Sequence, residues 1–229
     1  MNTLLNPESL SETINLVNDA LLAGIPIMES EKIAVSKWIA SRQGAPNSYA
    51  GMPAPTSEEL SKPIKRYTGE VITSKASLTH ILGEEACRVL LLLGVKEKSV
   101  TTALSRATEG MLAAIERQKA QNPDRAGTYC CGGCTPAYWR HLAAGGLNRQ
   151  EQEIEAGLRV LKAHRTVDGT WRRFPVAWTI AALVDIGKPA REELLYVAKT
   201  LETYCKVNET NDIYRLRRKR IAERACALL

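Results

Sequence analysis

The chain has 229 residues, of which 45% are hydrophobic and 24% are charged, and this composition is ordinary for a globular protein. No apolar run approaches the roughly 18 residues of a membrane span, and residues 1–8 have neither the basic region nor the apolar core of a signal peptide. We therefore expect a cytoplasmic protein without a membrane span. The net charge of +6 is modest for this length, so it does not single out nucleic acid as a partner.

Most of the chain carries apolar residues at helical spacing, and no useful stretch alternates with a period of two. Four prolines between residues 44 and 77 exclude a continuous helix there and predict an insertion that is either functional or mobile. The sequence thus predicts a single all-α domain over 1–229 with a Pro-rich insertion at 44–77. We expect about nine helices, at 6–23, 29–43, 78–93, 99–121, from 135, from 148, at 176–186, from 189 and at 210–228.

Three stretches share one pattern, in which a helix leads through a polar turn to an aromatic residue and then to an apolar helix that ends near glycine. Their turns end at Tyr49, Tyr129 and Trp171, and the last two contain Gly-Thr-aromatic. Gly146 and Gly187, which close two of the apolar helices, are 41 residues apart. Repeats of about this length form stacked or closed arrays of helical hairpins.

Helices that follow the aromatic turns are apolar nearly all round, whereas those that follow the glycines are amphipathic. A helix that is apolar on every side must be enclosed. We therefore expect a two-layer helical-hairpin repeat, with the apolar helices inside and the amphipathic helices outside.

The stretch from Leu161 to Gly187 resembles the repeats of the terpene cyclase and protein prenyltransferase superfamily. The resemblance lies in Asp168, Gly169, Trp171, Phe174, Trp178 and Thr179, and residues 123–146, with Asp124, form a weaker copy. It implies an α/α toroid, here an open arc or partial barrel. The chemistry of that family is not implied, because the chain has no paired-Asp run and the zinc ligands of the prenyltransferases cannot be assigned in it.

The repeated aromatic residues could line a central pocket for an apolar or cationic ligand. The simpler interpretation is that they are packing anchors doing the same job in each copy. Asp168 and Asp124 are expected to stabilise their turns. The ligand-binding candidates are Tyr129, Trp139, Arg140, His141, Asp168, Trp171 and Trp178.

The segment that most suggests a chemical role is Cys-Cys-Gly-Gly-Cys, with cysteines at 130, 131 and 134. Cys131 and Cys134 have the Cys-x-x-Cys spacing of zinc ligands and of redox pairs, and Cys134 precedes a predicted helix N-terminus. Cys130 is expected to point elsewhere, and His141 lies about 10 Å further along the helix, too far for one ion. We favour a loop with free thiols and keep two alternatives, zinc at Cys131 and Cys134, and a redox or nucleophilic use of the thiols; no other cofactor is expected.

The basic segment from Arg215 to Arg220 is the one candidate for binding phosphates, but Ile213, Leu216 and Ile221 mark a buried face, so we interpret the arginines as a solvated face. The sequence therefore favours a helical-repeat binding or interaction module with a protein or an apolar small molecule as its partner, and does not favour nucleic acid. The alternative is a small enzyme or isoprenoid-binding protein of the prenyltransferase type, and whether the protein is an enzyme stays open.

Overall fold

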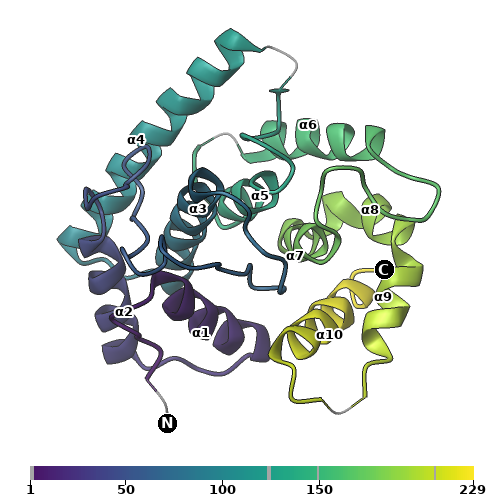
Figure 1. The fold of residues 1–229 in the computed structure, drawn as a ribbon, viewed down its shortest axis with the longest axis horizontal. Coiled ribbons are helices and arrows are strands. Elements are labelled where there is room, and N and C mark those ends of the chain that lie inside the picture. Colours follow the sequence, from purple (N-terminus) through teal and green to yellow (C-terminus); the bar gives the residue numbers. More distant parts are fainter. Residues whose placement is uncertain (1–2, 123–124, 149, 209) are drawn as a thin grey trace.

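The computed structural model describes residues 3–122, 125–148, 150–208 and 210–229, and the regular secondary structure within them is entirely helical (Figure 1). This confirms the all-α prediction. In the same residues no helix is long and apolar enough to cross a membrane. The helices are α1 (Leu10–Ala23), α2 (Glu29–Ser41), α3 (Lys75–Leu93), α4 (Lys98–Gln121), α5 (Thr135–Ala143), α6 (Gln150–Ala163), α7 (Val176–Ile186), the 3-10 helix η2 (Lys188–Ala190), α8 (Arg191–Tyr196), α9 (Ala198–Cys205) and α10 (Ile213–Cys226).

Local sequence explains where several helices begin and end. The hydroxyls of Ser9 and Ser74 accept hydrogen bonds from the first turns of α1 and α3, and thus satisfy amides that have no partner within the helix. Gly24 and Gly94 end the same two helices in the left-handed conformation that glycine adopts without strain.

Five inner helices, α1, α3, α5, α7 and α10, contact one another in that order, and α10 returns to contact α1. The outer helices α2, α4, α6, α8 and α9 lie on the outside of this group (Figure 1). Burial follows the same division, because seven of the eleven residues of α7 are buried, whereas in α6 only Gly157 and Leu161 are buried among the described residues.

The structure has one more α-helix than expected, because the amphipathic helix predicted after Pro189 is divided at Val197 into α8 and α9. Tyr196, the last residue of α8, contacts Arg165 and Thr166. Its hydroxyl donates to the backbone carbonyl of Thr166, and the guanidinium of Arg165 lies 4.5 Å from the centre of its ring.

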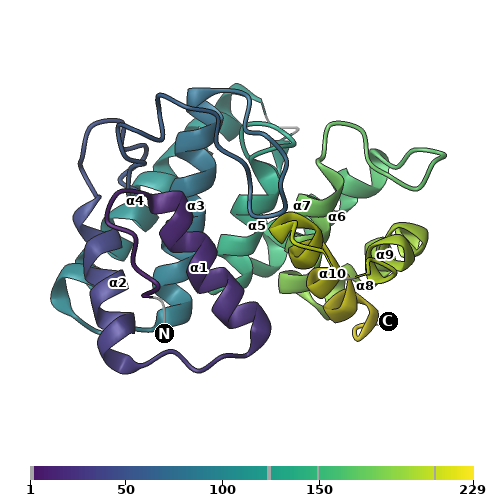
Figure 2. The same ribbon diagram turned by 60° about the horizontal axis from the view of Figure 1, so that its bottom comes forward.

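The Pro-rich insertion is packed against the inner helices. Residues 42–74 lie along one end of α3 and α5 (Figure 2), and Met52, Ala54 and Thr68 are fully buried. Further along, Glu70 accepts a hydrogen bond from the backbone N–H of Trp178, so its carboxylate caps the positive end of α7. The insertion is therefore a structural cover for the inner helices.

Our prediction that the arginines of α10 form a solvated face is wrong for Arg217. Its side chain is buried, and its guanidinium is paired with Asp19 of α1 at 2.6 Å and lies over the ring of Tyr67 at 4.5 Å. The neighbouring Arg218 donates to the carbonyl of Thr68. These two arginines, which we expected on a solvated face, therefore join α10 to α1 and to the insertion.

Candidate metal centre

The segment from Tyr129 to Cys134 forms a tight turn that leads into α5. The carbonyl of Cys131 accepts hydrogen bonds from the amides of Cys134 and Thr135, which begins the helix. Glycine is required inside this turn, because a Cβ on Gly132 would lie 2.2 Å from the carbonyl oxygen of Arg173. The turn therefore presses against the segment that precedes α7.

Cys130 has a left-handed backbone, with φ of 55°, which is uncommon for a residue other than glycine. This conformation brings its side chain toward that of Cys134, so our expectation that Cys130 points elsewhere is wrong. A non-glycine residue held in this region costs about 1–3 kcal/mol and persists only where the surroundings enforce it.

His80 of α3 completes the group. Its Nδ1 lies 4.0 Å from Sγ of Cys134, and the ligand atoms of His80, Cys130 and Cys134 all lie within 4.8 Å of one another. Sγ of Cys131 is 3.6 Å from Sγ of Cys134. We call these four residues the thiol-imidazole cluster. Within the described parts of the chain, the trio of His80, Cys130 and Cys134 is the one group of histidine, cysteine or acidic residues placed to hold a metal ion.

Aromatic rings fix the imidazole of His80. The ring of Tyr49 lies 4.3 Å from it and that of Tyr129 lies 5.4 Å from it, centroid to centroid. Burial lowers the pKa of His80, which keeps the imidazole neutral and able to act as a ligand near neutral pH. Tyr129, one of the ligand-binding candidates, therefore serves as a wall of the cluster.

The three thiols differ in exposure and acidity. Hydrogen bonds from Cys130 and Cys134 lower the pKa of Cys131, which is exposed. Hydrogen bonds with Cys130 and Cys131, together with burial, raise the pKa of Cys134. Arg66 adds positive charge nearby, because a Cβ on Gly133 would lie 2.7 Å from its Nη2. Cys131 is thus the thiol that most readily carries the negative charge.

Three donors of the cluster, from His80, Cys130 and Cys134, lie close enough together to approach one zinc ion. A tetrahedral zinc ion takes sulfur at about 2.3 Å and nitrogen at about 2.0 Å, which places two ligand atoms roughly 3.5–3.8 Å apart. The separations of 3.6 Å between Cys131 and Cys134 and of 4.0 Å between Cys134 and His80 are close to these values. Three thiolates and one imidazole are ligand types that structural zinc sites use.

A shallow groove of about 270 Å³ opens beside the cluster. Cys130, Cys131, Arg125, Arg173 and Phe174 contribute to its lining. We call it the cysteine groove. It gives solvent and small molecules access to Cys131, while Cys134 behind it is only 1% exposed.

The remaining aromatic candidates are packed between helices. Trp139 is fully buried, stacks on Phe174 at 5.8 Å and donates from Nε1 to the carbonyl of Gly127 at 2.7 Å. Trp178 is 1% exposed and lies beneath the guanidinium of Arg140 at 4.7 Å. Both rings therefore have the anchoring contacts that the simpler interpretation of the repeated aromatics predicts.

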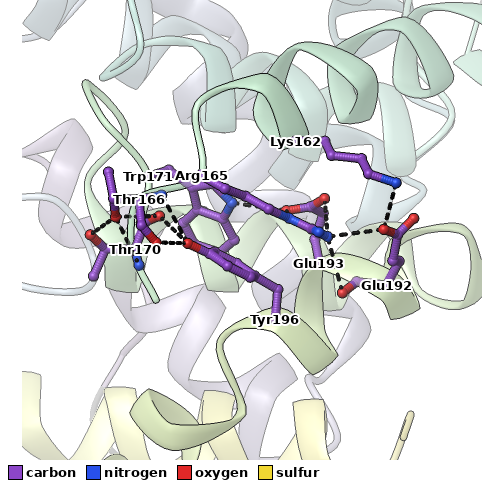
Figure 3. A network of polar contacts seen from close by, with 8 residues as sticks. All are labelled: Lys162, Arg165, Thr166, Thr170, Trp171, Glu192, Glu193 and Tyr196. Carbon is purple, nitrogen blue, oxygen red and sulfur yellow. Dashed lines mark hydrogen bonds and ion pairs between the residues drawn. The ribbon is translucent and has the colours of Figure 1, made fainter. Parts of the chain in front are cut away.

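Trp171 belongs to a turn that is held to α8 (Figure 3), and Asp168 lies in the same turn. The carboxylate of Asp168 accepts hydrogen bonds from the hydroxyls of Thr166 and Thr170, and these bonds lower its pKa. Nε1 of Trp171 donates to Glu193 at 2.8 Å, and Arg165 pairs with the same carboxylate at 2.7 Å. The Asp-Gly-Thr-Trp turn is therefore fastened to the next outer helix.

The turn before Tyr129 is likewise hydrogen-bonded to a glutamate of the next outer helix, α6. Glu153 of α6 accepts hydrogen bonds from the amide of Gly127 and from the hydroxyl of Tyr138, both at 3.1 Å, and pairs with Lys119 at 2.6 Å. Glu153 and Glu193 thus each join an aromatic turn to the next outer helix along the chain, α6 and α8 respectively. Asp124, expected in the first of these turns, lies outside the described residues.

Arg140 and His141 lie in a buried polar network between the inner helices. The Nε of Arg140 donates to Asp185 at 2.8 Å, and Asp185 also pairs with Arg88 at 2.9 Å. His141 contacts the carboxylate of Glu84. His141 is therefore paired with Glu84, away from the thiols. His80, 50 residues before Cys130, is the histidine that lies beside the thiols, and sequence spacing could not reveal it.

A cavity of about 40 Å³ lies beside this network, lined by residues that include Asn18, Tyr67, Arg88, Arg140 and Asp185. Sites for drug-sized ligands occupy about 300–1,000 Å³. This cavity has room for a few water molecules.

The cluster and the buried network are two places where chemically active side chains converge in the described structure. The first contains soft metal ligands, and the second contains paired charges at the centre of the molecule. The chain matches no family model, no curated protein and no solved structure.

Proposed function

We propose that this protein is a helical binding module in which one zinc ion, held by His80, Cys130, Cys131 and Cys134, has a structural role. The convergence of His80, Cys130 and Cys134 from two segments 50 residues apart carries the proposal, and Sγ of Cys131 lies 3.6 Å from Sγ of Cys134. Four protein ligands complete the coordination of zinc, which is typical of a structural site rather than a catalytic one.

The ion would tie the first turns of α3 to the turn before α5. These two helices already pack against each other, and the cysteine groove is built on the same turn. A bound zinc would therefore hold the shape of this surface without lining a reaction pocket. We propose that a protein partner binds to surfaces of this kind.

We further propose that the two helix layers form a partial α/α toroid. The order of contacts among the inner helices, with α10 against α1, supports this arrangement. The equivalent use of Glu153 and Glu193 supports a repeated hairpin unit. Isoprenoid binding at the centre of the inner helices has less support, because the cavity beside the central network is about 40 Å³ and its lining includes charged groups.

Metal analysis of the purified full-length chain tests the zinc proposal. We expect one zinc per chain by inductively coupled plasma mass spectrometry, and a loss of most of it in His80→Ala and in Cys134→Ser. Cys226→Ser is the matched control, because Cys226 is exposed and outside the cluster, and it should retain the metal.

Chelation should also lower the melting temperature. Zinc present at about 1,000 times its Kd stabilises the folded state by about 4 kcal/mol, which corresponds to roughly 8–16 °C for a chain of this size. Protein that contains no zinc after growth in zinc-supplemented medium, or variants of His80 and Cys134 that keep a full equivalent, would refute the proposal.

A further inference from the structure

Cys131 and Cys134 form an unequal pair within the thiol-imidazole cluster. Cys131 is exposed and opens onto the cysteine groove, whereas Cys134 is 1% exposed and lies behind it. Their sulfur atoms are 3.6 Å apart, and two glycines join them. A disulfide requires about 2.05 Å between the sulfurs, so a movement of about 1.5 Å in a glycine-rich turn would suffice.

Positive charge and amide groups surround this pair. The guanidinium of Arg66 is 8% exposed and close to Gly133, and its Nε has no hydrogen-bond partner in the described structure. The pair also lies at the start of α5, where the helix dipole favours negative charge. Cysteines that bind zinc do so as thiolates, and the thiolate is the form that reacts with oxidants.

We propose that the metal centre is an oxidation-sensitive switch, in which a hydroperoxide converts Cys131 and Cys134 into a disulfide and thereby releases zinc. This inference rests on the zinc site proposed above. In the first step the thiolate of Cys131 attacks a peroxide oxygen. An S–O bond forms, the O–O bond breaks, and an alcohol or water leaves after it takes up a proton.

In the second step the thiolate of Cys134 attacks the sulfur of the Cys131 sulfenic acid. The S–S bond forms, the S–O bond breaks, and hydroxide leaves as water after protonation. Overall, two thiols and one hydroperoxide give one disulfide, one alcohol (water when the oxidant is hydrogen peroxide) and one water. Zinc then keeps only Cys130 and His80, and two ligands hold it far less tightly than four.

Cys134 is the resolving residue for a geometric reason. A disulfide between the adjacent residues Cys130 and Cys131 would close a small ring and strain the intervening peptide. The Cys-x-x-Cys pair has no such restriction. Cys205 and Cys226 also interact with each other, so they could form a second disulfide that would confuse the measurement.

The test therefore uses the full chain with Cys205→Ser and Cys226→Ser, loaded with zinc. Hydrogen peroxide is added in the presence of a chromogenic zinc indicator. We expect one equivalent of zinc to be released as two free thiols are lost, and peptide mass mapping to find a link between residues 131 and 134. A dithiol reductant should restore the thiols, and added zinc should then rebind.

Two comparisons make the test specific. Adding Cys131→Ser should slow zinc release by peroxide at least tenfold. If that variant binds zinc too weakly, mapping of the disulfide in the parent protein still decides the question. Zinc that stays bound after peroxide treatment, or a disulfide that maps elsewhere, would overturn the switch. A parent protein that holds no zinc before peroxide is added would instead overturn the zinc site itself.

Discussion

Substituting Gly157 of α6 tests how closely an aromatic turn packs against its outer helix. A Cβ at this position would lie 2.4 Å from Nε1 of Trp139 and 2.6 Å from the carbonyl oxygen of Gly127. These two atoms form a buried hydrogen bond of 2.7 Å with each other. An added methyl group would therefore push against both partners of one bond.

Two opposing effects determine the outcome of Gly157→Ala. In an exposed helix the change stabilises by about 1 kcal/mol. Here overpacking costs about 2 kcal/mol, and disruption of the buried hydrogen bond costs about 2 kcal/mol more. The net expectation is a destabilisation of about 3 kcal/mol, or roughly 6–12 °C in melting temperature for a chain of this size.

Thermal and urea unfolding of the purified variants would measure this change. Gln152→Ala, at an exposed position of the same helix, is the control and should lie within about 0.5 kcal/mol of the parent. In a Trp139→Phe background the cost of Gly157→Ala should shrink, because the nearest clashing atom is absent. A neutral or stabilising Gly157→Ala, or an equal cost in both backgrounds, would refute this account of the packing.

Two further predictions concern buried charge. Asp185→Ala removes the carboxylate that pairs with Arg88 and Arg140. Because two buried guanidinium groups then lack this partner, the free energy of unfolding measured in urea should fall by about 3–5 kcal/mol. A fall of less than about 1 kcal/mol would show that water can replace the carboxylate. Stability should also fall in acid. Burial alone would raise the pKa of Glu153, but its hydrogen bonds, the strongest from Lys119, outweigh burial and lower the pKa below the ordinary value of 4.5. The stabilisation from ionised Glu153 is therefore complete well above pH 4.5 and disappears as the pH falls through the lowered folded-state pKa. The urea midpoint should accordingly drop between about pH 5 and 3, and it should drop less in Glu153→Gln.

Sequence reasoning succeeded where structure depends on neighbours along the chain. Helix periodicity predicted most of the helices, and Gly187 predicted the end of α7, because these signals act over one or two turns. The apolar character of residues 176–186 likewise predicted that α7 is largely buried. The helix after Pro189 was expected in one piece because nothing local marks Val197 as a break.

The site depended on contacts that spacing does not report. His80 belongs to another helix from the cysteines, and Cys130 contributes only because its backbone is left-handed. Arg217 was placed in solvent because five neighbouring charges resemble an exposed face, yet Asp19, 198 residues earlier, pairs with it inside the molecule. A lone histidine and a basic run carry no local signal of such partners.

The ion pair between Asp19 and Arg217 has a consequence for how the protein is made. Synthesis at about 5–20 residues per second separates the two residues by roughly 10–40 s. During that interval a growing chain carries the carboxylate of α1 without the guanidinium that it meets in the finished molecule. The contact between α1 and α10 through this ion pair can therefore form only after the helices between them have been synthesised.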